Sequence, residues 1–141
     1  MGKGTKVVID NNVFISGFGW NGKPEEILKL LQDNHIVNYI TSEIFEELRR
    51  VISYPKLNFS ESLQIKILEF VLFHSECVEP EERISAVTED PDDNKFLECS
   101  IAAKAEYIIS GDPHLIKLKN FRTVEIVDVN EFLNIISKKN L

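Results

Sequence analysis

The chain has 141 residues, the usual size of one domain, and its 43% hydrophobic and 28% charged residues are an ordinary balance for a soluble globular protein. Its apolar runs are far shorter than the roughly 20 residues that a membrane span needs, and no apolar signal segment follows the N-terminal lysines, so we expect a cytoplasmic protein without membrane contact. The formal net charge of −7 argues against binding of nucleic acid over the whole surface, which needs an excess of lysine and arginine. Cys77 and Cys99 lack the spacing of a metal site, and we expect both to be buried thiols.

The first half of the chain alternates strand patterns with helix patterns. Apolar periodicity and capping residues predict, in chain order, a strand over 7–9, a helical stretch from residue 12, a helix over 25–32, a strand over 35–40, a helix over 42–53 and a helix from residue 60. Glycines and Pro24 mark a loop before the helix over 25–32, and Pro55 ends the helix over 42–53.

The second half continues this alternation. The pattern predicts, in chain order, a strand over 76–78, a polar loop over 79–89 with at most one helical turn, a helix from the DPDD sequence at 90–93 to about residue 104, strands over 107–110 and 124–127, and a helix over 130–136. A sharp turn is expected at residues 111–113. Because strands alternate with helices, we expect an α/β fold with a parallel sheet covered on both faces, in one domain that spans residues 1–141.

Two of the predicted strands deliver an aspartate to the same edge of the sheet. Asp10 follows the strand over 7–9, and Asp112 lies two residues after the strand over 107–110. In an open parallel sheet, ligands bind beyond the carboxyl ends of the strands, which is where both carboxylates would lie. Each aspartate alone has another explanation, because aspartates often cap the helix that follows such a turn.

Two of the predicted helices add one carboxylate each. On the earlier helix, Glu47 flanks the apolar stripe, whereas Glu43 and Glu46 point nearly opposite to it. On the later helix, Asp93 shares a face with the apolar residues three and four positions further on, and Asp92 does not. Glu47 could equally be a solvated helix residue, and Asp93 could be an N-cap or a charge that the helix dipole favours.

Together, these four acids favour metal-dependent hydrolysis of a phosphodiester. Mg²⁺ and Mn²⁺ prefer oxygen ligands, and in such sites they orient the phosphodiester, generate hydroxide from bound water and stabilise the leaving oxygen. Without a cation, four crowded carboxylates repel one another and raise each other's pKa values. We therefore expect the catalytic metal ligands of one site to be Asp10, Glu47, Asp93 and Asp112.

Four segments resemble the four motifs of the PIN-domain nucleases, in the same order and with matching intervals. They are residues 7–13 (VVIDNNV), 44–51 (IFEELRRV), 93–102 (DNKFLECSIA) and 109–112 (ISGD). The resemblance is strongest to the PIN subgroup described as toxin components of toxin–antitoxin pairs. It implies a PIN-like three-layer α/β sandwich around a central, mainly parallel five-stranded sheet.

The same resemblance implies an activity and partners. It points to an endoribonuclease that hydrolyses RNA with Mg²⁺ or Mn²⁺, that forms a homodimer and that has an antitoxin protein as a partner. Ser110 corresponds to a supporting hydroxyl in the last motif, and Asn12 is expected to orient a ligand or the turn after the first strand. The chain departs from the family at Asn11, where Thr or Ser is usual, and we expect this amide to tune the site rather than to inactivate it.

Three alternative interpretations are open at this point. A haloacid-dehalogenase-like phosphatase also begins with a strand and an aspartate, but it needs a second aspartate two residues on, where this chain has Asn12. A response-regulator receiver needs paired acids near the first strand and a lysine after a late strand, and neither pattern is satisfied. The third alternative is a non-catalytic PIN-fold scaffold, which no missing acid supports.

Basic and histidine residues give weaker indications. Arg49, Arg50 and Lys95 could bind substrate phosphates, although solvated surface charge is the more common explanation. His114 could lie near the cleft, or Pro113 could turn it outward.

Aromatic residues in or beside the glycine-rich stretch indicate either an exposed apolar patch, of the kind that often marks an interface, or cover for the core. These residues are Phe14, Phe18 and Trp20.

Overall fold

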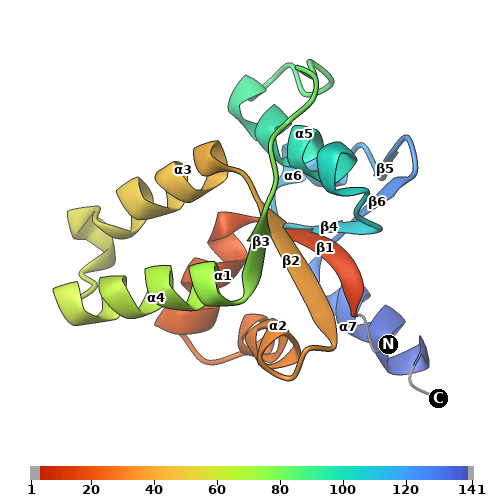
Figure 1. Ribbon diagram of the computed structural model, residues 1–141. Coiled ribbons are helices and arrows are strands. Elements are labelled where there is room, and N and C mark those ends of the chain that lie inside the picture. Colours follow the sequence, from red (N-terminus) through yellow and green to blue (C-terminus); the bar gives the residue numbers. More distant parts are fainter. Residues whose placement is uncertain (1–3, 140–141) are drawn as a thin grey trace.

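A central sheet of six strands organises the structure, a computed structural model that describes residues 4–139 (Figure 1). In chain order the strands are β1 (Thr5–Ile9), β2 (Ile36–Ile40), β3 (Ser75–Cys77), β4 (Tyr107–Ile109), β5 (Asn120–Phe121) and β6 (Val124–Val127). Their order across the sheet is β3-β2-β1-β4-β6-β5, and all neighbours are parallel except β5, which runs antiparallel to β6. The sheet is mainly parallel, as predicted, but it has six strands rather than five.

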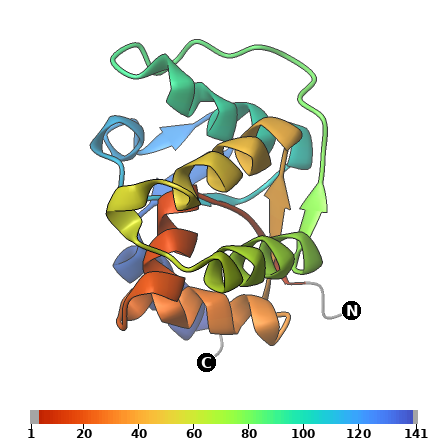
Figure 2. The same cartoon turned by 90° about the vertical axis from the view of Figure 1, so that its left-hand side faces the viewer.

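Helices cover both faces of this sheet. They are α1 (Asn11–Gly19), α2 (Lys23–Gln32), α3 (Ser42–Ile52), α4 (Glu61–Phe73), α5 (Asn94–Ala103), α6 (Pro113–Ile116) and α7 (Val129–Lys139), with 3₁₀ turns at Pro55–Leu57 and Pro91–Asp93. Helix α5 crosses one face of the sheet, whereas α1, α2 and α7 lie on the other (Figure 1, Figure 2). Helices α3 and α4 contact each other and extend as an arm to the left in Figure 1. Within residues 4–139, no helix combines the length and the apolar character that crossing a membrane requires.

The central strands are short apolar runs that are buried on both faces. Val7, Val8 and Ile9 of β1 and Ile108 and Ile109 of β4 are fully buried. Unbroken runs of this kind are typical of strands with helices on both sides, because successive side chains point into opposite layers. Pairing of Ile9 with Ile109 puts the carboxyl ends of β1 and β4 side by side, which fixes the edge where the first and last predicted acids lie.

The sequence does not predict two short elements. Strand β5 has two residues and pairs with β6 across a tight turn in which Arg122 has a φ of 56°. Helix α6 has four residues and begins directly after Asp112, which accepts a hydrogen bond from the backbone N–H of His114. Both elements are too short to show hydrophobic periodicity. Residues 79–89 are irregular, as predicted.

Burial differs from expectation at two side chains. Phe14, considered for an exposed patch, is completely buried in the core. Cys77 is exposed on the edge strand β3, so only Cys99 is the buried thiol that the sequence analysis expects of both. Phe18 is half-buried and packs edge-to-face on Phe70, with the two ring centroids 5.2 Å apart, and Trp20 is exposed.

Candidate active site

The carboxyl ends of β1 and β4 bring Asp10 and Asp112 to one edge of the sheet. The backbone N–H of Asp10 continues the pairing by donating to the carbonyl of Ile109, at 2.9 Å. The hydroxyl of Ser110 then links the two strand ends, because it donates to Asp10 Oδ2 at 2.6 Å and accepts from the backbone N–H of Asp112 at 3.0 Å. Ser110 thus lies between the two aspartates, where a supporting role in the site stays a prediction.

Both aspartates also cap the helices that follow them. Asp10 Oδ1 accepts from the backbone N–H of Asn12 at 3.2 Å, at the start of α1. Asp112 Oδ1 accepts from the backbone N–H of His114 at 2.8 Å, at the start of α6. A role as helix cap is compatible with a role as ligand-binding carboxylate. Capping uses only one oxygen of each carboxylate, and it fixes the direction in which the carboxylate points.

Asp93 is the buried member of the DPDD sequence. It lies where the 3₁₀ turn Pro91–Asp93 meets α5, and only 8% of its surface is exposed, whereas 60% of the Asp92 side chain is exposed. The helical spacing of the sequence predicts this difference correctly. Asp93 Oδ2 is buried and has no hydrogen-bond partner among the described residues, which is costly for a carboxylate unless a ligand supplies one.

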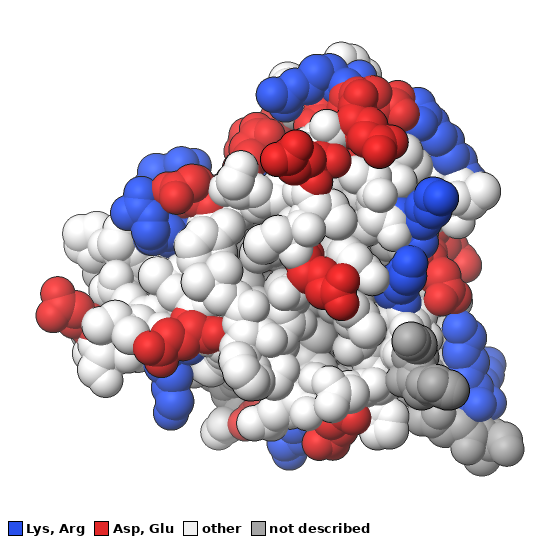
Figure 3. Space-filling model, viewed as in Figure 1, with Lys and Arg blue, Asp and Glu red and all other residues white. Residues whose placement is uncertain are grey.

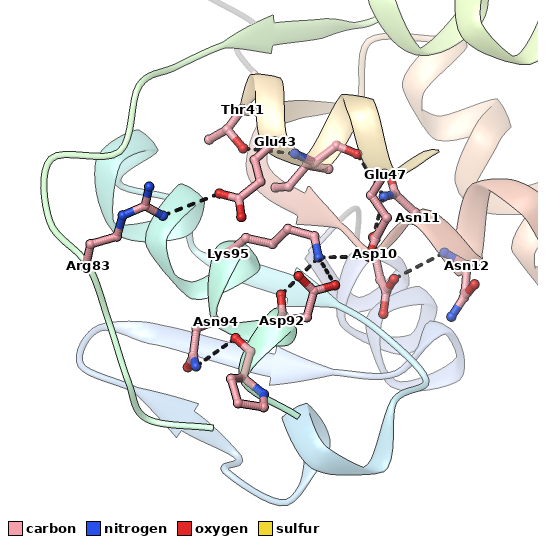
Figure 4. Close-up of polar contacts among 12 residues, drawn as sticks. Asp10, Asn11, Asn12, Thr41, Glu43, Glu47, Arg83, Asp92, Asn94 and Lys95 are labelled. Carbon is pink, nitrogen blue, oxygen red and sulfur yellow. Dashed lines mark hydrogen bonds and ion pairs between the residues drawn. The ribbon is translucent and has the colours of Figure 1, made fainter. Parts of the chain in front are cut away.

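Glu47 reaches the same region from α3, where two side chains hold it (Figure 4). Its Oε2 accepts from the ammonium of Lys95 at 2.8 Å, and its Oε1 accepts from the amide of Asn11 at 2.9 Å. Lys95 also donates to Asp92, at 2.7 Å to Oδ2 and at 2.9 Å to the backbone carbonyl. With all three N–H donors used and 3% of its side chain exposed, Lys95 orients Glu47 and has no donor left for the substrate phosphates that were considered for it.

The amide of Asn11 explains how the chain accommodates its departure from the family pattern. Its two N–H bonds are both used, one for Glu47 and the other for the backbone carbonyl of Ile44 at 3.0 Å. A Thr or Ser hydroxyl has one donor and cannot make both contacts. Asn11 thus fixes the position of α3 relative to α1, and with it the carboxylate of Glu47.

The irregular segment over 79–89 is held against α5 by two polar side chains. Asn94 exchanges hydrogen bonds with the backbone of Val87, at 2.8 and 2.9 Å, as a neighbouring strand would. The buried carboxylate of Glu98 accepts from the backbone N–H of Ile84 at 3.0 Å and from Arg83 at 3.3 Å. These contacts determine where the segment ends, which is at Asp90.

A pocket of about 190 Å³ opens where these elements meet. Its lining includes all four acids predicted from the sequence, and its residues are Asp10, Asn11, Asn12, Glu47, Val51, Asp90, Asp92, Asp93, Phe96 and Asp112. A larger hollow of about 740 Å³ lies between α2 and α7, but it contains none of these acids. The smaller pocket is therefore the candidate active site.

Crowding and burial change the acidities in this pocket. Burial, together with the neighbouring carboxylate of Asp112, raises the pKa of Asp93 to about 8. Burial also raises the pKa of Asp10, and the hydrogen bond from Ser110 opposes that increase. The pKa of Asp92 is lowered, because Lys95 donates a hydrogen bond to it. The two acids with a raised pKa, Asp10 and Asp93, form no hydrogen bond with Lys95.

This donor set fits a hard divalent cation. Ligand atoms of Asp90, Asp93, Asp112 and His114 all lie within 4.8 Å of one another. Carboxylate oxygens are the preferred ligands of Mg²⁺ and Mn²⁺, and the unpartnered oxygen of Asp93 is the kind of group that such an ion satisfies. A divalent charge would also relieve the repulsion that raises the pKa of Asp93.

Several predicted residues lie outside the pocket, and two unpredicted ones belong to the cluster. Arg49 forms a surface ion pair with Glu46 at 2.7 Å. Arg50 is exposed, and a hydrogen bond to Tyr54 and the charges of Glu47 and Asp92 are among the causes that raise its pKa. The sequence does not indicate Asp90 as a site residue, and it leaves open whether His114 lies near the cleft or points outward. Only their positions in the sequence could have indicated these two residues. Asp90 is the first acid of the DPDD sequence, and His114 follows Asp112 by two residues.

The raised pKa of Asp93 predicts how stability depends on pH in the cation-free protein. Its carboxyl keeps its proton up to about pH 8 when folded but loses it near the ordinary value of 3.8 when unfolded, so the folded state binds more protons between these values. The free energy of unfolding, measured with urea in EDTA, should therefore fall as pH rises from about 5 to about 8. Asp93→Asn should remove most of this fall.

Asp92→Asn is the matched control for that experiment. The pKa of Asp92 is lowered, so its stabilising contribution is fully present above 3.8 and constant across the tested range. A parent protein and an Asp93→Asn variant with the same pH slope would show that Asp93 does not keep its proton when folded.

Comparison with known proteins identifies the family of the chain. The family model described as PIN domain matches residues 6–114, which include Asp10, Glu47, Asp93 and Asp112. The chain is also 38% identical over 134 residues to the uncharacterized protein MJ1680 of Methanocaldococcus jannaschii, covering 92% of this chain and 80% of that protein. The chain therefore belongs to the PIN-domain family of metal-dependent nucleases.

Proposed function

We propose that this protein is an endoribonuclease that hydrolyses RNA phosphodiester bonds with Mg²⁺ or Mn²⁺. The observation that carries the proposal is the buried, unpartnered oxygen of Asp93 beside the carboxylates of Asp10 and Asp112. These three residues, with Glu47, are the candidates to hold the ion. When bound, the cation supplies charge neutralisation at the phosphate and a lowered pKa of water.

The chain's own residues supply the orientation of this site. Ser110 fixes Asp10, and the backbone N–H of His114 fixes Asp112. Asn11 and Lys95 hold Glu47 so that its charge is balanced in the absence of substrate. A pocket of about 190 Å³ has room for a phosphate group but not for a whole nucleotide, so the proposal is that a flexible strand lies across its mouth. Arg50, an exposed cation on which the charges of the pocket residues Glu47 and Asp92 act, is a candidate to contact a flanking phosphate.

The sharpest test of this function compares two adjacent aspartates. Asp93→Asn should abolish cleavage of a labelled single-stranded RNA with Mn²⁺, because it removes the buried ligand. Asp92→Asn should lower cleavage by about tenfold at most, because Asp92 acts only through Lys95. A DNA strand of the same sequence tests the preference for RNA. Full activity in both variants would show that the nuclease site is built from other residues, whereas no cleavage by the parent protein would favour a non-catalytic PIN scaffold.

We also propose that the protein is the toxin of a toxin–antitoxin pair, which rests on the resemblance of its four motifs to that PIN subgroup. Induced expression of the parent should arrest growth of a host cell, and expression of Asp93→Asn at the same level should not. Co-expression of a small reading frame adjacent to the gene, as the source of an antitoxin, should restore growth. Equal growth with the parent and with Asp93→Asn would contradict the toxin role.

For the oligomeric state, we propose a symmetric homodimer through α4. The exposed stripe of this helix carries Ile65, Leu72 and Phe73, the last with 85% of its surface exposed. Lys66 and Glu69 lie on the same stripe and form no ion pair within residues 4–139. In two antiparallel copies of α4, Lys66 of each copy lies opposite Glu69 of the other, so the stripe is self-complementary in charge. Figure 3 shows few charged side chains across the face that includes α4 and β3.

Light scattering tests this dimer. The parent should have twice the monomer mass of 16.2 kDa at micromolar concentration, and Phe73→Ser should shift it toward the monomer. Trp20→Ser is the control, since Trp20 is also exposed but lies at the end of α1 rather than on α4. A parent that is monomeric across the micromolar range excludes the dimer.

A further inference from the structure

Within the described residues, the group of potential metal ligands whose atoms lie close together is not the set of four acids that the family motifs imply. It consists of Asp90, Asp93, Asp112 and His114, with all ligand atoms within 4.8 Å of one another. Asp10 and Glu47 line the same pocket but lie outside this set. Two members, Asp90 and His114, come from outside the motif acids, and one of them offers nitrogen rather than oxygen.

Asp93 is the independent sign that this cluster has a ligand. Its surface is 92% buried, and its Oδ2 has no hydrogen-bond partner among residues 4–139. A buried carboxylate oxygen without a partner is destabilising, so an acidic cluster of this kind is expected to be completed by a cation. The other buried carboxylate in α5, Glu98, has both of its oxygens paired.

The imidazole of His114 is placed to share an ion with Asp112. Its Nδ1 lies 3.6 Å from Asp112 Oδ1, which is longer than an N–H···O hydrogen bond. In an octahedral site with ligands at about 2.1 Å, neighbouring ligands are about 3.0 Å apart and opposite ones about 4.2 Å apart. The observed separations are close to that range, and the His114 side chain is 41% exposed, so a small rotation brings the four ligands together.

Nitrogen in the ligand set changes which ion is favoured. Mg²⁺ takes oxygen ligands and gives up water reluctantly, whereas the first-row transition ions bind imidazole. A site made only of carboxylates offers oxygen alone, so its ligands do little to favour Mn²⁺ over Mg²⁺. We propose that Asp90 and His114 complete a mixed oxygen–nitrogen cation site with Asp93 and Asp112, and that His114 makes this site select Mn²⁺ over Mg²⁺. This inference rests on the proposed metal-dependent function and specifies its ion.

The irregular segment before α5 supplies the fourth ligand. Asp90 ends the stretch that Asn94 and Glu98 attach to α5, the helix that begins directly after Asp93. The backbone N–H of Asp93 also donates to the carbonyl of Asp90 at 3.0 Å, and Asp112 is joined to His114 through the first turn of α6. The site is formed between these two pairs.

Ion binding without any RNA tests the inference. Binding of Mn²⁺ and of Mg²⁺ is measured by isothermal titration at about pH 8, where imidazole is neutral. In His114→Asn, the affinity for Mn²⁺ should fall by about tenfold or more while the affinity for Mg²⁺ changes little, so the ratio of the two falls. Asp90→Asn should weaken both ions. His35→Asn, which changes a histidine on the loop before β2, should leave both affinities unchanged.

Two outcomes separate this inference from the proposed function. If His114→Asn keeps the parent ratio of Mn²⁺ to Mg²⁺ affinity, His114 is not a ligand and the inference is overturned, while loss of both ions in Asp93→Asn still supports the metal-dependent nuclease. If Asp93→Asn binds both ions as tightly as the parent, the site itself is wrong and both proposals fail. Melting temperatures of all variants in EDTA confirm that each is folded.

Discussion

The carboxylates of Asp10, Asp93 and Asp112 lie closer together than their charges favour without a cation, and much of the structure serves to hold them there. The parallel pairing of β1 with β4 supplies two of them, and burial of the first turn of α5 supplies the third. Burial and mutual repulsion both favour the neutral acid, which is why the pKa of Asp93 rises to about 8. The fold remains stable because burial of apolar side chains in the central strands contributes more free energy than the crowding of these acids removes.

Lys95 divides the pocket into two halves with different electrostatics. On its side, Glu47 and Asp92 are paired with a buried ammonium, and their charges are balanced by the chain itself. On the other side, Asp10, Asp93 and Asp112 have no basic partner within 4.0 Å among residues 4–139 apart from His114. A cation entering the pocket is therefore attracted to the second half, where a positive charge is missing.

The sequence predicts the parts of the site that depend on local geometry. β-branched runs place Asp10 and Asp112 at strand ends, and helical spacing distinguishes the buried Asp93 from the exposed Asp92. The sequence does not predict that the side chain of Lys95 points into the protein toward Glu47, because the two residues are 48 positions apart. Asp90 is likewise placed by contacts of an irregular segment, which has no periodicity to analyse. Strand β5 is not predicted from the sequence for a related reason, since two residues are too few to show an alternation of apolar and polar side chains.

The hydrogen bond from Ser110 to Asp10 joins residues that are 100 positions apart, and this separation affects when the pocket can form. During synthesis Asp10 leaves the ribosome well before β4 and Asp112, because Ser110, next to both, lies 100 positions further along the chain. Until then β1 lacks one of its two neighbours in the sheet, and Asp93 lacks the carboxylate beside it. Since domains generally fold as units, a nascent chain has no complete pocket. A nuclease assembled in this way acquires activity only after the segment that carries Asp112 has left the ribosome.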